Sequence, residues 1–443
     1  MFDFIGTALL NDLEAAEQTK VPREIYDFET AICGIPGEPD FKCLDRTTSA
    51  GFPESAKPKV KKGKQDFFGS EGDFQLDTPK ALELKAKIEA DLLLMKQNIR
   101  PEYIFSDNLK DERRKHKKVK TGATRLFSAC PLDLLILTRM YFGAFNLSLI
   151  KNRIRNGCCV GVNPYSEEWQ QLANYMCEYS EPGEKGFGAG DYSAFDASEL
   201  PQIHNVILDM INAWYNDSHS NIRRILWLEV TNSRHIINNK VYCWPASLGS
   251  GHGLTTMINN LYNLIALRYC LYRADDDNML SVVDFTKIVR AAVYGDDHDF
   301  SVREDYRTRF NESTICQFMA EIGLTYTNET KTGVNNELRP LWDITFLKRA
   351  FRLDDHINRI VAPLELDTVL EMVLWTKKRQ DADKIVHDNV QTALLELSLH
   401  PTTTFDAYGP RLVECYQKHY TDPLDYTKRQ LLLYKSTKTV AYL

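Results

Sequence analysis

Two adjacent carboxylates, Asp296 and Asp297, are the side chains of this chain that most clearly suit chemistry. They follow the apolar run 288–293 and a glycine, so the pattern predicts a strand that ends in a hairpin turn. A Gly-Asp turn is by itself more often purely structural, because both residue types tolerate positive φ. A second acidic segment far upstream supplies another carboxylate, Asp191, after a glycine-rich stretch. Two such segments that converge could hold a pair of Mg²⁺ ions, which prefer carboxylate and phosphate oxygens and promote phosphoryl transfer.

Strands and helices must bring these carboxylates together. We expect a buried strand at 186–191 that delivers Asp191 at its end, and a strand, turn and strand over 289–302, which together form the centre of an antiparallel sheet. A helix over 255–270 follows a glycine-rich segment. Apolar periodicity predicts further helices at 79–97, 201–215 and within 367–399.

Composition describes an ordinary globular protein that does not coat nucleic acid indiscriminately. The chain has 443 residues, 43% of them hydrophobic, and a formal net charge of −7. A polyanion must therefore be bound through local positive patches. Two patches are expected from the sequence. The first comprises Lys57, Lys59, Lys61, Lys62 and Lys64, and the second runs from Lys110 to Arg125.

Cysteine spacing and hydropathy indicate a soluble, reduced protein. The ten cysteines form no CxxC pair, which favours free thiols over a disulfide framework or a zinc site. No uninterrupted apolar run reaches the roughly eighteen residues of a membrane span, and the N-terminus lacks the positive start of a secretory signal. We therefore expect no direct membrane insertion.

Seven segments between residues 48 and 351 resemble, in order, the conserved motifs of viral RNA-dependent RNA polymerases. They are Thr48–Pro53 (motif G), Lys110–Arg125 (F), Asp191–Ser198 (A), Ser250-Gly251 with Thr255 and Asn259 (B), Tyr294–Asp297 (C), Lys331 (D) and Phe346–Arg349 (E). The order and number of these matches make coincidence very improbable. The chain resembles the polymerases of picorna-like positive-strand RNA viruses, the picornavirus, iflavirus and dicistrovirus group, and 362–364 and 393–397 resemble the thumb of the insect viruses.

This resemblance implies an α+β right-hand polymerase with an antiparallel-sheet palm and a helical thumb. Fingers are expected at 1–148 with an insertion at 199–250, palm at 149–198 and 251–353, and thumb at 354–443. The implied reaction is template-directed RNA synthesis from NTPs by two-metal nucleotidyl transfer, in the replication of a positive-strand genome. The implied cofactor is Mg²⁺, as two ions for which Mn²⁺ can substitute.

The same resemblance assigns roles to individual residues. Asp191, Asp296 and Asp297 are the implied catalytic and metal-binding carboxylates, and Lys331 the implied donor of a proton to the departing pyrophosphate. A surface lysine is the plain alternative for Lys331.

Further side chains are implied to bind the nucleotide. Those that would line the nucleotide channel are Lys110, Arg114, Arg125 and, with a weaker match, Lys118. Arginine's planar fork suits phosphate. The family often has a lysine two positions before Arg125, where this chain has Ala123.

Motif A and motif B residues are implied to read the ribose. Asp196, Ser250 and Asn259, linked by hydrogen bonds, would recognise the 2′-OH, with Thr255 beside them. Without the family context, Asn259 would be interpreted as satisfying backbone groups at a helix start.

RNA contacts are implied in motifs G and E. They are Thr48, Ser49 and Gly51, and Lys348 and Arg349, the last two binding backbone phosphates. His116, His252 and His298 have no metal-ligand spacing and are expected to be non-catalytic.

Two alternatives to an RNA polymerase stay open from the residues alone. A reverse transcriptase shares the metal carboxylates but closes the 2′-OH space with a bulky aromatic side chain, and an inactive RNA-binding subunit would not need three intact aspartates. The resemblance further implies as partners an RNA template and primer, a genome-linked protein with a uridylylated tyrosine, and other viral replication proteins. It places the enzyme in the host cytoplasm, at membrane-associated replication complexes that it reaches through partners or a precursor.

Overall fold

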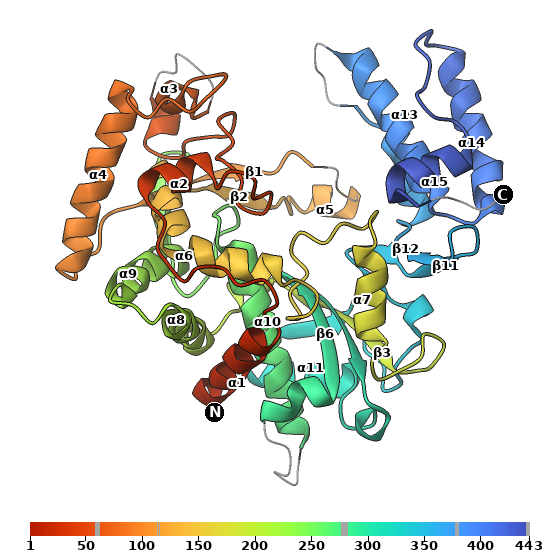
Figure 1. Ribbon diagram of the computed structural model, residues 1–443, viewed down its shortest axis with the longest axis horizontal. Helices are drawn as coiled ribbons and strands as arrows, with labels where there is room; N and C mark the ends of the chain where they lie inside the picture. The colour runs from red at the N-terminus through yellow and green to blue at the C-terminus, as the bar shows by residue number, and fades with distance from the viewer. Residues whose placement is uncertain (58–62, 113, 115, 276–281, 377–380, 440–443) are drawn as a thin grey trace.

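The chain folds around an antiparallel sheet flanked by helices, with helical regions at both ends of the molecule (Figure 1). The computed structural model describes residues 1–57, 63–112, 114, 116–275, 282–376 and 381–439. Its α-helices are α1 (Phe2–Ala15), α2 (Phe28–Cys33), α3 (Gln65–Phe68), α4 (Pro79–Lys96), α5 (His116–Lys120), α6 (Leu132–Lys151), α7 (Glu168–Met176), α8 (Pro201–Tyr215), α9 (Ser220–Thr231), α10 (Thr255–Ala274), α11 (Glu312–Glu321), α12 (Leu366–Glu371), α13 (Ala382–Ser398), α14 (Thr402–Gln417) and α15 (Arg429–Thr437). The strands are β1 (Ile104–Leu109), β2 (Leu126–Ala129), β3 (Phe187–Ser193), β4 (Ser233–Ile237), β5 (Lys240–Trp244), β6 (Val289–Tyr294), β7 (Asp297–Val302), β8 (Thr325–Asn328), β9 (Thr345–Phe346), β10 (Arg349–Ala350), β11 (Arg352–Asp354) and β12 (Arg359–Val361). The helices predicted at 79–97, 201–215 and 255–270 are confirmed as α4, α8 and α10.

The central sheet has the order β6-β7-β3-β8, with every neighbouring pair antiparallel. This confirms the predicted sheet of 186–191 and 289–302. Gly190 pairs with His298 and Asp191 with Thr327, so the end of β3 lies between the start of β7 and β8. The register therefore carries the acidic segment of β3 to the edge where β6 turns into β7.

Alternating glycines on β3 let large rings pack against the sheet. A Cβ at Gly188 would lie 2.3 Å from the ring of Phe300, and one at Gly190 would lie 2.4 Å from the ring of Tyr326. Phe187 and Ala189, which alternate with these glycines, point to the other face, because side chains alternate along a strand. The glycine-rich stretch before Asp191 is thus a packing requirement of one face.

Each face of the sheet has its own core. On the Phe300 and Tyr326 face, α10 packs on β6, and α11 packs on β8 and β3. On the Phe187 face, α7 and the β9–β10 hairpin contribute Trp169 and Phe346 to a separate apolar cluster. Helix α1, although it falls in the segment predicted as fingers, packs against α8 and α10.

A second sheet, of order β2-β1-β4-β5, joins strands from the two segments predicted as fingers. Next to it lies α6, the one helix of the described ranges that is long and apolar enough to cross a membrane. This corrects the expectation that no apolar stretch has that length. Within the protein, 78% of its most apolar window is buried, as is typical of a core helix.

The C-terminal part is helical, as predicted for a thumb. Helices α12 to α15 enclose a cluster that includes Val369, Leu394, Phe405 and Leu432. In Figure 1 these blue helices lie on one side of the central sheet, and α2, α3 and α4 lie on the other. The predicted α+β architecture, with an antiparallel central sheet and a helical C-terminal region, is therefore confirmed, while the exact subdomain boundaries stay predictions.

Candidate active site

Asp296 and Asp297 lie at the tight turn between β6 and β7. Tyr294 pairs with Asp297 across a two-residue turn, in which Gly295 has φ +68°. Gly295 supplies the left-handed conformation at no steric cost, as such hairpins require. Asp296 is the more exposed of the two residues at the turn, and Asp297 is partly buried at the start of β7.

Two asparagines of α10 hold this turn from below. Asn260 Oδ1 accepts a hydrogen bond from Gly295 N at 2.5 Å, and Asn263 Nδ2 donates to Gly295 O at 3.1 Å. Asn263 Oδ1 also accepts from the Tyr192 hydroxyl on β3 at 2.9 Å. Both asparagines are buried, so the turn is fixed to the helix and, through Tyr192, to the strand that carries Asp191. Sequence reasoning missed this role, although a pair of asparagines three residues apart inside a helix is a usable signal, since asparagine disfavours helix interiors.

Asp191 joins this turn from the neighbouring strand and contacts a lysine. Lys331 Nζ lies 2.8 Å from Asp191 Oδ2, and Asp191 Oδ1 accepts from Tyr192 N at 2.6 Å. Lys331 sits at a turn after β8 with φ +60°. Two residues predicted from separate motifs are thus in direct contact.

Burial and crowding of negative charge raise the pKa of the aspartates at the turn. Loss of hydration raises the pKa of Asp297 to about 6, and the charges of Asp296 and Asp191 add to the increase. The pKa of Asp296 is also raised, by lost hydration and by the Asp191 charge. Mutual repulsion of this kind favours a bound cation.

Asp196 and Asn259 meet next to this edge, as predicted. Asn259 Nδ2 donates to Asp196 Oδ1 at 2.7 Å, and Asn259 Oδ1 is buried without a hydrogen-bond partner. The predicted hydrogen-bonded link to Ser250 is wrong in this conformation, because the Ser250 hydroxyl donates to the carbonyl of Leu126 at 3.2 Å. Ser250 instead connects the loop before α10 to β2, since its carbonyl also accepts from Ser128 N.

Thr255 has a structural position at the start of α10. Its hydroxyl lies 3.1 Å from the carbonyl of Gly249 and 3.2 Å from that of His252. It therefore closes the glycine-rich loop onto the helix and does not face Asp196.

The basic segment is arranged around one carboxylate that the sequence did not single out, Glu112. Arg114 Nε lies 2.9 Å from Glu112 Oε1, and Arg125 Nε donates to the same oxygen at 2.9 Å. Hydrogen bonding to Arg125 lowers the pKa of Glu112 to about 2, and the Arg114 charge adds to this. Burial raises the pKa of Asp196, and the charge of Lys110, which is itself partly buried, offsets part of that increase.

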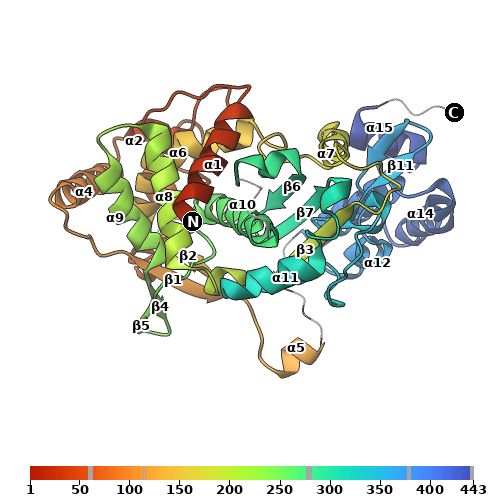
Figure 2. The ribbon, with the colours of Figure 1, turned by 90° about the horizontal axis from the view of Figure 1, so that it is seen from below.

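Lys118 lies apart from these groups, on the exposed helix α5. Figure 2 shows α5 projecting away from the body of the molecule. This exposed position of Lys118 agrees with its weaker match to the side chains of motif F.

The motif G residues lie on a loop with internal hydrogen bonds. The Thr48 hydroxyl donates to the Asp45 carbonyl at 2.8 Å and also accepts from Lys64. Gly51 has φ +72°, and a Cβ there would lie 2.3 Å from the carbonyl of Cys130, so only glycine fits. Ser49 lines a groove of about 520 Å³ between this loop, β2 and the β4–β5 turn.

The first predicted lysine patch, which runs from Lys57 to Lys64, is only partly a surface patch. Lys64 is buried and bonded to Thr48, so it is not a surface charge, because its ammonium serves the loop. Lys57 pairs with Glu54 on the surface. Lys59, Lys61 and Lys62 lie outside the described residues.

Lys348 and Arg349, predicted together as RNA ligands, face different surroundings. Lys348 is exposed at the turn between β9 and β10, and its charge lowers the pKa of Asp297. The prediction that Arg349 binds an RNA phosphate is wrong in this structure, because its guanidinium is already paired. Its Nη1 and Nη2 lie 3.0 and 2.8 Å from the two carboxylate oxygens of Glu396 on α13, and Nη1 also donates to the Ala362 carbonyl at 2.7 Å. Arg349 joins the thumb helices to the palm, because burial selects a carboxylate partner for its charge.

The histidines have no catalytic geometry. His298 and His252 are buried, and burial lowers the pKa of each to about 3, so both are neutral. His298 stacks on Tyr326 behind the turn, and His252 lies near Phe105. His116 is exposed on α5.

Comparisons with known proteins agree with this geometry. A family model described as viral RNA-dependent RNA polymerase matches residues 10–417. The chain is similar to the replicase polyproteins of acute bee paralysis virus (strain Rothamsted), at 35% identity over 418 residues and 91% of this chain, and of Drosophila C virus (strain EB), at 34% over 404 residues and 88% of this chain. It spans 21% and 23% of the length of these two curated relatives.

A solved structure shares the fold. The sicinivirus 3Dpol RNA-dependent RNA polymerase superposes with a TM-score of 0.78 at 21% sequence identity, over 98% of this chain and 83% of the other.

Proposed function

Because the chain belongs to the viral RNA-dependent RNA polymerase family, and is thus an RNA-directed RNA polymerase, we propose that Asp191, Asp296 and Asp297 are the carboxylates at which it joins nucleotides. One observation carries this assignment: the end of β3 and the β6–β7 turn bring these aspartates close enough that the charge of Asp191 raises the pKa of both Asp296 and Asp297. The reaction is template-directed synthesis of RNA from NTPs in the replication of a positive-strand RNA virus.

Divalent metal dependence is general in this family, and we propose two Mg²⁺ ions, with Mn²⁺ able to substitute. When bound, the ions lower the pKa of the attacking hydroxyl and neutralise the leaving phosphate. The residues fit this cofactor, since crowded, partly desolvated carboxylates gain from a cation. Within the described ranges, no group of three or more His, Cys, Asp or Glu side chains forms a metal site by itself. Mg²⁺ commonly uses one or two carboxylates together with substrate phosphates.

The chain's own side chains do the remaining work. Lys331, whose ammonium lies 2.8 Å from Asp191, donates a proton to the departing pyrophosphate. Lys110, Arg114 and Arg125 neutralise the incoming triphosphate, with Lys118 further out on α5. Lys348 contacts a primer phosphate, and Thr48, Ser49 and Gly51 form the loop along which the template passes.

Selection of the ribose rests on the Asp196–Asn259 pair. The unpartnered Oδ1 of Asn259 is a buried acceptor that a 2′-OH would satisfy. Ser250 and Thr255 act on this pair only by shaping the loop before α10. These features and the family assignment favour RNA synthesis over reverse transcription.

Primer extension tests the assignment. Wild type should extend an RNA primer on an RNA template with NTPs and Mg²⁺, and Asp296→Asn should lose about a hundredfold or more of the rate, because a neutral amide is a weaker Mg²⁺ ligand. Asp297→Asn should lose less. The matched control is Asp73→Asn, an exposed aspartate outside the site. Wild-type speed in Asp296→Asn would overturn the assignment.

The partners and location are also proposals. The similar proteins are polyproteins, which supports cooperation with other viral replication proteins and with a genome-linked protein that primes synthesis. The apolar helix α6 is buried, so recruitment to replication membranes in the host cytoplasm would pass through those partners or a precursor. Fractionating cells that express this chain alone or with the remaining polyprotein tests this, since only the second should place it on membranes.

A further inference from the structure

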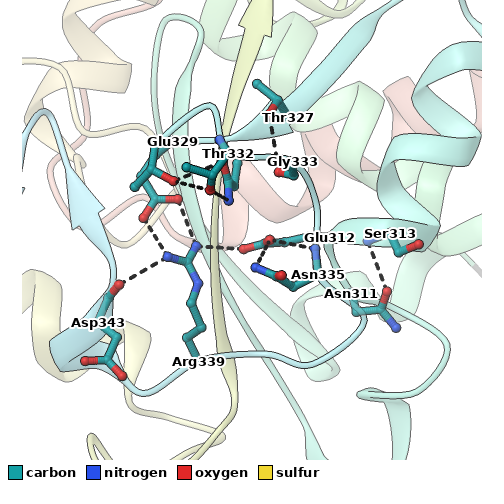
Figure 3. A network of polar contacts seen from close by, with 12 residues as sticks. Asn311, Glu312, Ser313, Thr327, Glu329, Thr332, Gly333, Asn335, Arg339 and Asp343 are labelled. Atoms are coloured by element: carbon teal, nitrogen blue, oxygen red, sulfur yellow. Dashed lines mark hydrogen bonds and ion pairs between the residues drawn. The ribbon is translucent and has the colours of Figure 1, made fainter.

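Arg339 lies at the centre of a polar network below the Lys331 loop (Figure 3). Its Nη1 donates to Glu329 Oε1 at 2.8 Å, and its Nη2 donates to Glu329 Oε2 at 2.8 Å and to Glu312 Oε1 at 2.7 Å. Nη1 also donates to the carbonyl of Asp343 at 3.1 Å. One guanidinium thus holds two carboxylates from different segments, the loop after β8 and the start of α11.

The loop itself is closed by Asn328. Asn328 Oδ1 accepts from Thr332 N at 2.9 Å and from the Thr330 hydroxyl at 3.1 Å, while Lys331 N donates to Asn328 O at 3.0 Å. Lys331 has φ +60° within this closed turn. These hydrogen bonds fix the backbone conformation between Glu329 and Thr332. The anchoring of Glu329 therefore also sets the position of the Lys331 Cα.

Arg339 is also joined to the strand that carries Asp191. Arg339 N donates to Phe187 O at 2.7 Å, and Phe187 N donates to Arg339 O at 2.9 Å. Phe187 begins β3, and Asp191 lies four residues further along the same strand. Arg339 therefore binds β3 through its backbone and the Lys331 loop through its side chain.

Loss of the guanidinium would release the loop rather than the strand. Glu312 is fully buried and also accepts from Asn335 N at 3.2 Å, so it stays with α11. Glu329, without Arg339, would face the negative charge of Glu312 with no compensating cation, and like charges in a buried site repel strongly. The movable partner is the loop, and with it Lys331.

We propose that Arg339 is a positioning residue that sets the place of Lys331 relative to Asp191, and so controls the rate of nucleotidyl transfer without touching substrate. The inference rests on the proposed role of Lys331. It adds a requirement that no motif contains, a partly buried arginine outside the segments A to G.

A double-mutant cycle between Arg339 and Lys331 tests the proposal, using single-nucleotide incorporation with pre-bound RNA. Lys331→Leu should slow the maximal rate roughly a hundredfold, the size of a general-acid contribution. Arg339→Gln should slow it roughly tenfold while KM for NTP changes little, because the nucleotide contacts are elsewhere. In the Lys331→Leu background, Arg339→Gln should have almost no further effect, since residues acting through one group are not additive.

Three further variants separate positioning from stability. Arg339→Lys should recover part of the rate, because one ammonium can satisfy Glu329 but cannot bridge both carboxylates. Glu329→Gln keeps the Arg339–Glu312 pair and serves if Arg339→Gln does not fold; it should show the same non-additivity with Lys331→Leu. The control is Arg290→Gln on β6, which removes a comparable bidentate ion pair, the one between Arg290 and Glu178. It should leave the rate of incorporation unchanged.

The outcomes are distinct. Equal slowing by Arg339→Gln in both backgrounds, or a rise in KM alone, would overturn the positioning role while leaving the polymerase assignment intact. No slowing in Lys331→Leu would overturn both this inference and the proton-donor role of Lys331. Failure of Asp296→Asn to lose activity would instead overturn the assignment of the site.

Discussion

The β6–β7 turn and the basic segment Lys110–Arg125 are both predicted to bind the triphosphate and its metals, but they are built in opposite ways. The turn is fixed by buried asparagines of α10, and the charges of Lys331 and Lys348 offset only part of the negative charge that it carries. The basic segment is largely exposed, and its arginines share one carboxylate, Glu112. The carboxylates of the β6–β7 turn are thus pre-organised, and their negative charge is not neutralised within the protein. The arginines of the basic segment are already paired with Glu112, so they must exchange this partner for phosphate when the substrate arrives.

The strongest way to break this contrast is to loosen the turn. Asn263→Ala removes the donor to Gly295 O and the strong acceptor for the Tyr192 hydroxyl, which keeps only the Met319 sulfur at 3.9 Å. We expect a loss of about 1–3 kcal/mol of unfolding free energy and a rate loss of tenfold or more. Thermal denaturation and single-nucleotide incorporation measure the two effects. Unchanged activity with lowered stability would mean that the turn does not need this anchor.

The ribose pair sharpens the contrast, because it belongs to the pre-organised side. Asp196→Ala or Asn259→Ala should slow incorporation of CTP and narrow the preference for CTP over dCTP by roughly tenfold, since each removes a group that rewards the 2′-OH. Comparing CTP and dCTP in wild type and both variants gives the ratio. A uniform slowing with the ratio preserved would place recognition of the 2′-OH elsewhere.

The pH dependence of Asp297 tests whether its charge is unsatisfied. Its pKa of about 6 in the folded protein lies above its usual value of 3.8, so the folded state holds this proton more tightly than the unfolded chain does. Protonation therefore stabilises the fold, and that stabilisation is lost as pH rises from about 4 through about 6. Without divalent metal, Tm should fall across this window, and Asp297→Asn should flatten the change. Polymerase activity should move the other way, rising as the carboxylate ionises. A Tm profile identical in the variant would show that Asp297 titrates normally.

The smallest expected effect comes from the exchangeable side. Glu112→Gln should free Arg114 and Arg125 for the triphosphate and lower KM for NTP by up to about fivefold, the range of an exposed ion pair. Stability should hardly change, because the Arg125 side chain is 60% exposed. Steady-state kinetics and thermal denaturation check both statements. A raised KM would instead mean that Glu112 positions the two arginines for binding.

Much of this architecture could be predicted from the sequence because the chemistry and the periodicity are local. The apolar run 288–293 and the glycine-rich stretch before Asp191 predict the strands at 289–302 and 186–191, and the resemblance to the family motifs implies that Asp191 and Asp296 meet. The contact between Asp196 and Asn259 follows from the family pattern. The strand signals are carried by residues close together in the chain, whereas the two contacts join distant segments and were predicted from the resemblance to the family motifs.

What could not be predicted depends on partners distant in sequence. Arg349 has the composition of a phosphate ligand, but Glu396 lies close to it only because the thumb packs there. Lys64 belongs by spacing to a surface patch, yet the loop of Thr48 encloses it. Ser250 turns to the Leu126 carbonyl because β2 lies beside its loop. Arg339 lies outside every motif, and Glu112, although inside the basic segment, has nothing in the sequence that marks it as the partner of Arg114 and Arg125.

The opposite environments of Lys348 and Arg349 have a mechanical consequence. Arg349 is locked to Glu396 and to the Tyr165 ring, while Lys348, its immediate neighbour at a two-residue turn, lies near Asp297. The turn is too short to absorb rotation between them. Because Phe346 of the same hairpin packs in the cluster under the central sheet, the β9–β10 hairpin is held from both sides, and we expect a displacement of the C-terminal helices either to break the Arg349–Glu396 ion pair or to shift Lys348 relative to Asp297.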